Sequence, residues 1–146
     1  MLDSLKIHGA ITAQLIKADG TVQTVHQDNA IVDVGFDFIA DSIGNPTSRP
    51  NIMKYIAVGS GTTAVNASQK ALVSQLLCKE AEYEHLSGTK VFKFSTMFIP
   101  GEATGAITEA AVFNADGGTM LDRVIFSVIN KGLDDSLRVT FTFTMS

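Results

Sequence analysis

The chain has 146 residues, of which 45% are hydrophobic and 18% are charged, and its net charge at pH 7 is −4. This composition excludes a disordered chain and fits one globular domain with a sizeable core. The eleven Lys and Arg residues are scattered, so the sequence lacks the basic run that marks a nucleic-acid-binding protein. We also expect no membrane partner, because no apolar run is long enough to span a bilayer.

The start of the chain and its single cysteine indicate where the protein is made. Met1 is not followed by a basic region and an apolar stretch of signal-peptide length, and Cys78 has no second cysteine with which to form an internal disulfide. Assembly in a reducing cytoplasm fits both observations.

The first segment of the chain alternates with the period of a half-buried strand, and its apolar side consists of Leu5, Ile7, Ile11, Ala13 and Leu15. An Asp-Gly turn then leads into a shorter second strand at 21–27, so residues 1–27 are predicted to form a hairpin. Because the first strand is longer than its partner, we expect a neighbouring subunit or another segment to cover part of its edge.

Residues 33–43 are predicted to form a short helix. Its apolar residues are spaced four, three and four apart, which places them on one stripe: Val32, Phe36, Ile39 and Ile43. A glycine and a proline just after the segment supply stop signals. The polar loop at 45–51 follows, and its Asn45 and Arg49 are candidate interface residues.

A strand is predicted at 52–58, followed by a glycine-rich loop at 59–63. Such a loop invites a phosphate site, but this one lacks the lysine of a Walker loop and the third glycine of a dinucleotide loop, which favours a plain turn. Asn66 followed by Gln69 has the pattern of a capping box and predicts a second helix at 67–78.

Two further strands are predicted at 79–86 and 90–99, and a last strand covers the end of the chain. Phe92, Phe94 and Phe98 alternate on one face, and core packing is favoured over a platform that stacks bases or sugars. The last strand alternates most regularly, with these residues pointing one way: Leu137, Val139, Phe141, Phe143 and Met145. We expect the module to be complete at Ser146, with no fibre repeat after it.

The strongest hairpin signal lies at 100–123, where Asp-Gly-Gly at 116–118 reaches positive φ easily between two apolar strands. On the first of these strands Glu109 shares a face with apolar residues, namely Ile107, Ala111 and Phe113. A buried carboxylate without a partner would cost several kcal/mol. A three-residue turn leaves Glu109 diagonal to Arg123 on the same face, whereas a two-residue turn puts Arg123 on the other face. We therefore predict that Glu109 pairs with Arg123 or accepts hydrogen bonds from backbone donors.

Together these elements predict a mainly β fold, an antiparallel β-sandwich or barrel-like domain with two short helices. We expect a single domain over 1–146, with an N-terminal hairpin or arm at 1–30 and a β core at 52–146.

No arrangement of residues predicts a catalytic, cofactor or metal site. The three histidines have no His, Cys or acidic neighbour at a metal-ligand spacing: His8, His26 and His85. Cys78 lies at the end of the predicted second helix, where its pKa could be lowered, but no spacing argues for a Cys-His pair. Glu102 and Glu109 resemble a glycosidase carboxylate pair, but the loop that carries Glu102 is a poor platform. We expect that the chain is not an enzyme.

Four stretches of the sequence carry a resemblance to a known family: YIAVGSGTTA, ALVSQLL, PGEATGAITEAAVFNADGGTMLDR and INKGLDDSLRVTFTFTMS. They span most of residues 55–146. This region resembles a module that recurs in virion structural proteins of tailed bacteriophages, in small head proteins and at the start of some tail-fibre proteins. The resemblance implies a non-enzymatic part of the virion.

Two placements in the particle follow from the resemblance. In the first, the chain is a capsid cement (decoration) protein that sits as a homotrimer on the outer capsid surface and binds the major capsid protein. In the second, it is a tail, baseplate or tail-fibre attachment protein. The expected end of the module at Ser146 favours the head. A carbohydrate-binding receptor module is disfavoured, because the chain has no Trp and its aromatic residues alternate inward.

A cement protein must attach to a shell with which it did not fold. A free terminus that adds a strand to an exposed sheet edge supplies main-chain hydrogen bonds without a deep pocket. We therefore regard the N-terminal residues as further interface candidates: Met1, Leu2, Asp3, Ser4, Leu5 and Lys6.

Overall fold

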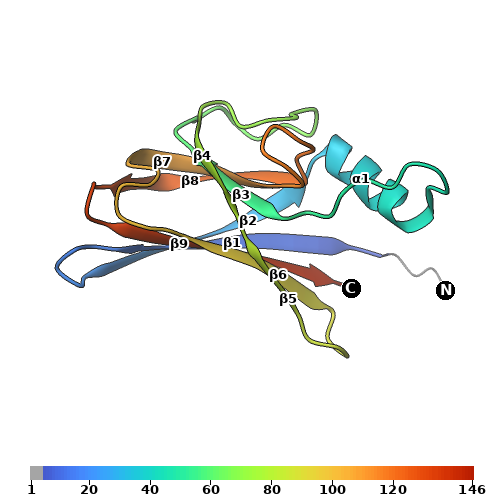
Figure 1. The fold of residues 1–146 in the computed structure, drawn as a ribbon, viewed down its shortest axis with the longest axis horizontal. Helices are drawn as coiled ribbons and strands as arrows, with labels where there is room; N and C mark the ends of the chain where they lie inside the picture. The colour runs from blue at the N-terminus through green and yellow to red at the C-terminus, as the bar shows by residue number, and fades with distance from the viewer. Residues whose placement is uncertain (1–4) are drawn as a thin grey trace.

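The computed structural model describes residues 5–146 and is mainly β (Figure 1). This part of the chain forms nine strands and one helix: β1 (Ile7–Ile16), β2 (Val22–Ile31), α1 (Asp33–Gly44), β3 (Tyr55–Gly59), β4 (Gln75–Glu80), β5 (Glu82–His85), β6 (Val91–Phe98), β7 (Gly105–Phe113), β8 (Asp122–Lys131) and β9 (Ser136–Met145). The predicted mainly β, antiparallel fold is confirmed, but only one of the two predicted helices forms. Within residues 5–146, no helix is long and apolar enough to cross a membrane.

The strands make one antiparallel sheet that curls into a nearly closed barrel. Their order is β4-β3-β7-β8-β2-β1-β9-β6-β5, so β4 and β5 stand at opposite ends of the sheet. Only Ala81 separates these two strands in the chain, and they therefore join the two ends (Figure 1). The Ala81 N–H donates to the Lys54 carbonyl and Thr96 Oγ1 donates to the Glu80 carbonyl, which holds this corner. The predicted strand at 79–86 is thus divided between β4 and β5.

The predicted N-terminal hairpin is present as β1 and β2, but both strands have ten residues. The expectation that the second strand is shorter is wrong, whereas the expected cover on the other edge of the first strand is present and comes from another segment of the same chain. β9 covers that edge along its whole length, from the pair Ile7–Met145 to the pair Ile16–Ser136. The hairpin lies between β8 and β9 in the sheet, and so it is an integral part of the barrel and not an appended arm.

The barrel interior holds the main hydrophobic core, which the alternating strands fill from all sides. Phe94 and Phe98 of β6 are buried there, and Phe92 packs against the core with its ring stacked 5.1 Å from that of Phe143. The predicted packing role of the β6 phenylalanines is confirmed. Each fully buried ring contributes about 1.5–3 kcal/mol to stability.

A second, smaller core lies outside the barrel wall, where the loop at 60–74 and the start of α1 cover β3, β7 and β8 (Figure 1). It contains Val32, Ala57, Leu72, Ala111, Phe113 and Met120. Ile107 was expected on the same face as Ala111, but it packs in the main core. The reason is a shift in the pairing register of β7 and β8 between Ile107 and Glu109, which breaks the alternation.

Helix α1 forms where it was predicted, but only Val32 and Ile39 of the predicted stripe pack inward. Gly35 allows the close approach, because a Cβ there would lie 2.1 Å from the Leu121 carbonyl oxygen. Phe38 and Ile39 pack against the main core, whereas Phe36 and Ile43 of the predicted buried stripe are 56% and 74% exposed.

The prediction of a second helix at 67–78 is wrong. Residues up to Ser74 form an irregular loop, and the rest belongs to β4. The backbone N–H groups of Val73 and Ser74 donate to the Glu109 carboxylate, while Leu77 and Cys78 pair with β3. Contacts with distant parts of the chain therefore use the groups that helical hydrogen bonds would need.

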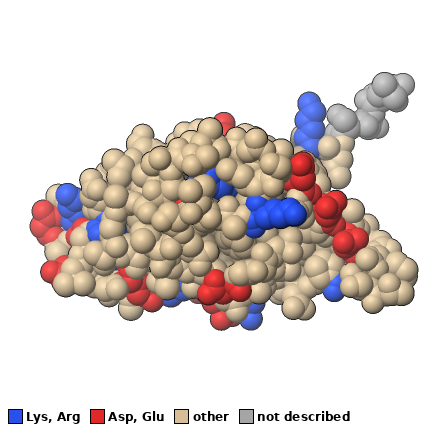
Figure 2. Space-filling view, turned by 90° about the horizontal axis from the view of Figure 1, so that it is seen from above, with Lys and Arg blue, Asp and Glu red and all other residues tan. Residues whose placement is uncertain are grey.

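Charged side chains are spread over the surface. On the face shown in Figure 2, Lys and Arg residues are separated from one another by uncharged residues and do not form a continuous patch. Acidic residues lie toward both ends of this face, and α1 carries Asp33, Asp37 and Asp41 along its length.

Candidate functional site

The hairpin of β7 and β8 builds the most polar buried site in the second core. Glu109 pairs with Ile125 and Ala110 with Val124, which leaves Arg123 diagonal to Glu109 on the same face. The expected ion pair is present, since Arg123 Nε donates to Glu109 Oε1 over 3.1 Å and both side chains are fully buried.

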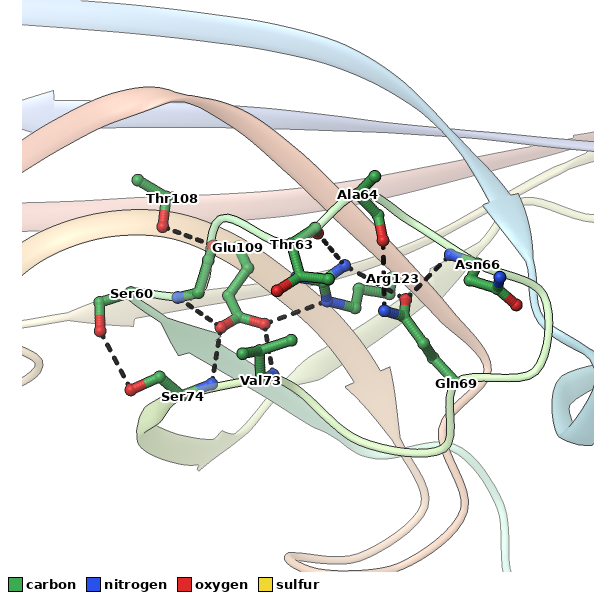
Figure 3. A network of polar contacts seen from close by, with 11 residues as sticks. Ser60, Thr63, Ala64, Asn66, Gln69, Val73, Ser74, Thr108, Glu109 and Arg123 are labelled. Carbon is green, nitrogen blue, oxygen red and sulfur yellow. Dashed lines mark hydrogen bonds and ion pairs between the residues drawn. The ribbon is translucent and has the colours of Figure 1, made fainter.

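The Glu109 carboxylate also accepts three backbone hydrogen bonds from the loop at 60–74 (Figure 3). Gly61 N–H and Ser74 N–H donate to Oε2 over 2.6 and 2.9 Å, and Val73 N–H donates to Oε1 over 2.8 Å. With Arg123, four donors surround the carboxylate. This arrangement satisfies a charge that would otherwise be costly to bury.

The glycine-rich loop at 59–63 is therefore an anion-binding loop, but its anion is a side chain of the same protein. A Cβ at Gly61 would lie 2.1 Å from Glu109 Oε2, and a Cβ at Gly59 would lie 2.4 Å from the Ser74 carbonyl oxygen. Only glycine permits these approaches. The predicted plain turn overlooked this role, because nothing in local sequence shows that Glu109, 48 residues beyond Gly61, would meet it.

Arg123 ties a second part of the same loop to the barrel (Figure 3). Its Nη1 donates to the Thr63 carbonyl over 2.8 Å and to Gln69 Oε1 over 3.2 Å. Among the described residues, Nη2 has no hydrogen-bond partner. The ion pair thus fixes a long irregular loop at both of its ends, and this is a structural task.

A second buried carboxylate, Asp122, was not singled out from the sequence. Val112 N–H donates to its Oδ1 over 3.1 Å, and Asn29 Nδ2 donates to its Oδ2. Complete burial raises the pKa of Asp122 to about 7. Asp122 lies where β2, β7 and β8 meet. Its position in the sequence, just after the hairpin turn, looks like that of an exposed turn residue, so nothing in the sequence indicates that it is buried.

The two glutamates considered as a catalytic pair belong to separate clusters. Glu102 accepts hydrogen bonds from Lys79 Nζ over 2.6 Å and from Ile99 N–H over 2.9 Å, and the Lys79 contact leads the causes that lower the pKa of Glu102. Lys131 donates to the Ile99 carbonyl, and its burial lowers its pKa. Lys79 and Lys131 therefore anchor the loop after β6 through Glu102 and the Ile99 carbonyl, in a cluster separate from that of Glu109.

The histidines and the cysteine do not form a reactive group. His8 lies 3.4 Å from Asp28 across the β1–β2 pairing, a contact that the sequence spacing hid, and His26 lies 4.0 Å from Asp28, two residues away on the same strand. All three side chains are largely exposed. His85 contacts the Val91 carbonyl. Cys78 lies in β4 and not at a helix end, and burial raises its pKa to about 11. Among residues 5–146, no group of His, Cys, Asp or Glu suits a metal ion.

The candidate interface residues fall into three groups. Residues 1–4 lie outside the described part of the chain. Leu5 is exposed, but Lys6 exchanges backbone hydrogen bonds with Ser146 and so extends the barrel, which contradicts its place in a free arm. Arg49 is exposed, whereas Asn45 Oδ1 accepts from the N–H groups of the loop after α1 and shapes that loop.

An apolar hollow of about 500 Å³ opens between α1 and the barrel end. Its wall includes Ile31, Phe38, Ile39, Ile52, Tyr83 and Phe94. Ile52 and Tyr83 remain 73% and 61% exposed at its rim. None of the described residues that line this hollow is charged, so it suits an apolar occupant.

Comparison with known protein families, curated proteins and solved structures found no match for this chain.

Proposed function

We propose that the chain is a non-enzymatic structural protein of a tailed-bacteriophage virion, and that it acts as a cement protein on the outer surface of the capsid. The sequence resemblance over residues 55–146 supports this function. A role in the tail, the baseplate or tail-fibre attachment is the alternative, because the same module resembles parts of both structures.

The observation that carries the proposal is the apolar surface at the α1 end of the barrel. Phe36 and Ile43 project outward from α1, and the rim of the neighbouring hollow exposes Ile52 and Tyr83. Large apolar side chains exposed on the helix and around a hollow beside it favour a surface that another protein covers. An enzyme would need convergent reactive groups, and the polar groups of the second core instead hold its own loop.

One of these apolar features protrudes and the other is hollow, and we propose that they meet in contacts between copies of this chain. An outward stripe of α1 supplies protruding side chains, and the hollow beside α1 supplies a receiving surface. When a protrusion and a hollow belong to the same molecule, head-to-tail contacts can close into a ring. We propose a homotrimer, which the resemblance to cement proteins favours, bound to the major capsid protein.

The experiment that tests the placement is separation of the particle into DNA-filled heads and tails, followed by quantitative mass spectrometry of each fraction. The proposal expects the chain in the head fraction, at a copy number comparable with that of the capsomers. Recovery with the tails would support the alternative, and absence from both fractions would overturn a virion role.

Adding purified protein back to heads that lack it provides a second measurement. A cement protein should bind and raise the temperature at which the heads release DNA. Binding without any gain in heat resistance would argue against a cement role.

A further inference from the structure

We propose that the opening between β2 and β8 receives an extended strand from another protein, which pairs with the free edge of β2 and accepts a hydrogen bond from Arg123. This inference rests on the proposed function only in supplying an assembly partner. Its test uses isolated protein and peptides, so that it can fail or succeed independently of any placement in a virion.

The opening exists because β2 and β8 pair over a very short distance. Their register contains two pairs, Ala30–Arg123 and Ile31–Asp122, after which the strands diverge. Within the described chain, residues 22–29 of β2 pair with β1 alone. A strand points backbone donors and acceptors to both sides, so one side of β2 offers a row of groups that no other strand of the barrel uses.

A hollow of about 330 Å³ lies where the two strands part. β2 contributes Gln27 and Asn29 to its wall, β8 contributes Arg123 and Ile125, and the loop at 60–74 contributes Val65. Val65 is 39% exposed, and Ile125 is half-buried. The site therefore combines an open strand edge with apolar side chains on the far wall, as strand-addition sites do.

Arg123 identifies the chemistry of the occupant. Its side chain is fully buried, but Nη2 has no acceptor among the described residues. A buried guanidinium N–H without a partner is costly, so an acceptor that reaches it is strongly favoured.

The acceptor is neutral and not an anion. Glu109 already balances the charge of Arg123, and Asp28 also lines the hollow, so a carboxylate or phosphate would meet an excess of negative charge. A backbone carbonyl has no such penalty. An extended peptide supplies this carbonyl and, in its next residues, the alternating donors and acceptors that the edge of β2 can pair with.

The test selects linear ten-residue peptides from an mRNA-displayed library on the immobilised full chain, and then measures binding of the enriched peptides. Val65→Glu places a charge at the wall of the opening without altering the barrel. Leu86→Glu is the matched control, because Leu86 is 72% exposed and lies in the β5–β6 turn. Amide hydrogen exchange with and without peptide locates the bound segment.

The expected result is enrichment of alternating apolar and polar peptides, with slower exchange at residues 22–29 and at the start of β8. Val65→Glu should weaken their binding by about tenfold or more, and Leu86→Glu should not. Arg123→Lys keeps the charge beside Glu109 but removes Nη2, and should weaken binding also.

Several outcomes overturn the proposal. They are a failure to enrich any peptide, protection confined to other strands, and equal binding by the Val65 and Leu86 variants. If the protein without peptide already protects residues 22–29 and Val65→Glu dissociates an oligomer, the occupant is a second copy of the chain, which also overturns it. Displacement of peptide by sodium phosphate alone would show that Arg123 receives an anion.

Discussion

Glu109 and Arg123 are charged side chains that are both fully buried, so either charge would be very costly to leave without its partner. The pair is stable only while its hydrogen bonds are complete, since charges in a low-dielectric interior lose their solvation by water. Three of the donors to Glu109 are backbone N–H groups from one loop. The state of this single carboxylate therefore decides whether residues 60–74 keep their conformation.

Glu109→Ala should lower the free energy of unfolding by about 3–5 kcal/mol, because it strands the Arg123 charge and leaves three backbone donors unpaired. Urea unfolding monitored by circular dichroism measures this loss. Glu102→Ala is the control, since the Lys79–Glu102 pair is only partly buried. A loss below about 1 kcal/mol for Glu109→Ala would show that the carboxylate is solvated.

The double variant Glu109→Leu with Arg123→Met separates the two contributions. It removes the stranded charge, so it should recover a substantial part of the loss. It should not recover all of it, because Gly61, Val73 and Ser74 still lack an acceptor. Full recovery would mean that these backbone hydrogen bonds contribute nothing to the free energy of unfolding.

Asp122 should make stability fall as the pH rises. Its pKa is about 7 in the folded protein and close to the usual 3.8 in the unfolded chain, so between these values the folded state binds more protons. The free energy of unfolding from this group therefore declines from about pH 4 upward and levels off above pH 7, with a slope approaching about 1.4 kcal/mol per pH unit.

Denaturant titrations from pH 4 to pH 8 check this dependence. Asp122→Asn removes the titrating group but keeps an acceptor for the Val112 N–H. The difference in unfolding free energy between wild type and variant should change across this range. A difference that stays constant with pH would show that Asp122 is ionised throughout.

Among the elements, the loop at 60–74 shows where local sequence signals stop being sufficient. Asn66 and Gln69 do form hydrogen bonds like those of a capping box, since Gln69 Oε1 accepts from Asn66 N–H and Asn66 Oδ1 accepts from Ser68 N–H. The helix does not follow. Its later N–H groups bind Glu109, so tertiary contacts override the local propensity.

The hairpins were predictable because their signals are local. Alternation and an Asp-Gly turn define β1 and β2, and the Asp-Gly-Gly turn indicates the hairpin of β7 and β8. The sequence leaves the register of that hairpin open between two turn lengths, and the structure places Arg123 diagonal to Glu109. The partner of β1 across the sheet was not predictable, because β9 lies more than one hundred residues away in sequence. The same limit hid the three backbone donors to Glu109.

Gly61→Ala should destabilise the loop at 60–74, because the added Cβ would occupy the position of Glu109 Oε2 and force the carboxylate away. We expect a loss of about 2 kcal/mol or more and faster proteolysis within the loop. Gly44→Ala is the matched control, since a Cβ there meets nothing within 4 Å. Equal stability of the two variants would mean that the carboxylate moves without cost.

On the scale of the whole molecule, the barrel has one closed corner and one open corner. β4 and β5 run almost continuously through the first, whereas β2 and β8 share only two pairs at the second. The apolar α1 end forms a further surface, with Phe36 and Ile43 exposed on the helix. The open edge is the one assigned above to a strand of another protein, whereas the α1 surface would remain in water on an isolated barrel, where it favours self-association.

The purified protein should therefore be a homo-oligomer, and a trimer is expected from the resemblance to cement proteins. Light scattering should give a mass well above the 15.5 kDa of one chain at micromolar protein, and three times that value for a trimer.

Ile43→Glu should shift the mass toward one chain, because obligate interfaces resemble a divided core and exclude unpaired charge. Leu133→Glu is the matched control, since Leu133 is 66% exposed between β8 and β9. A wild-type mass of 15.5 kDa at this concentration would refute self-assembly, and equal masses for the two variants would move the interface away from α1.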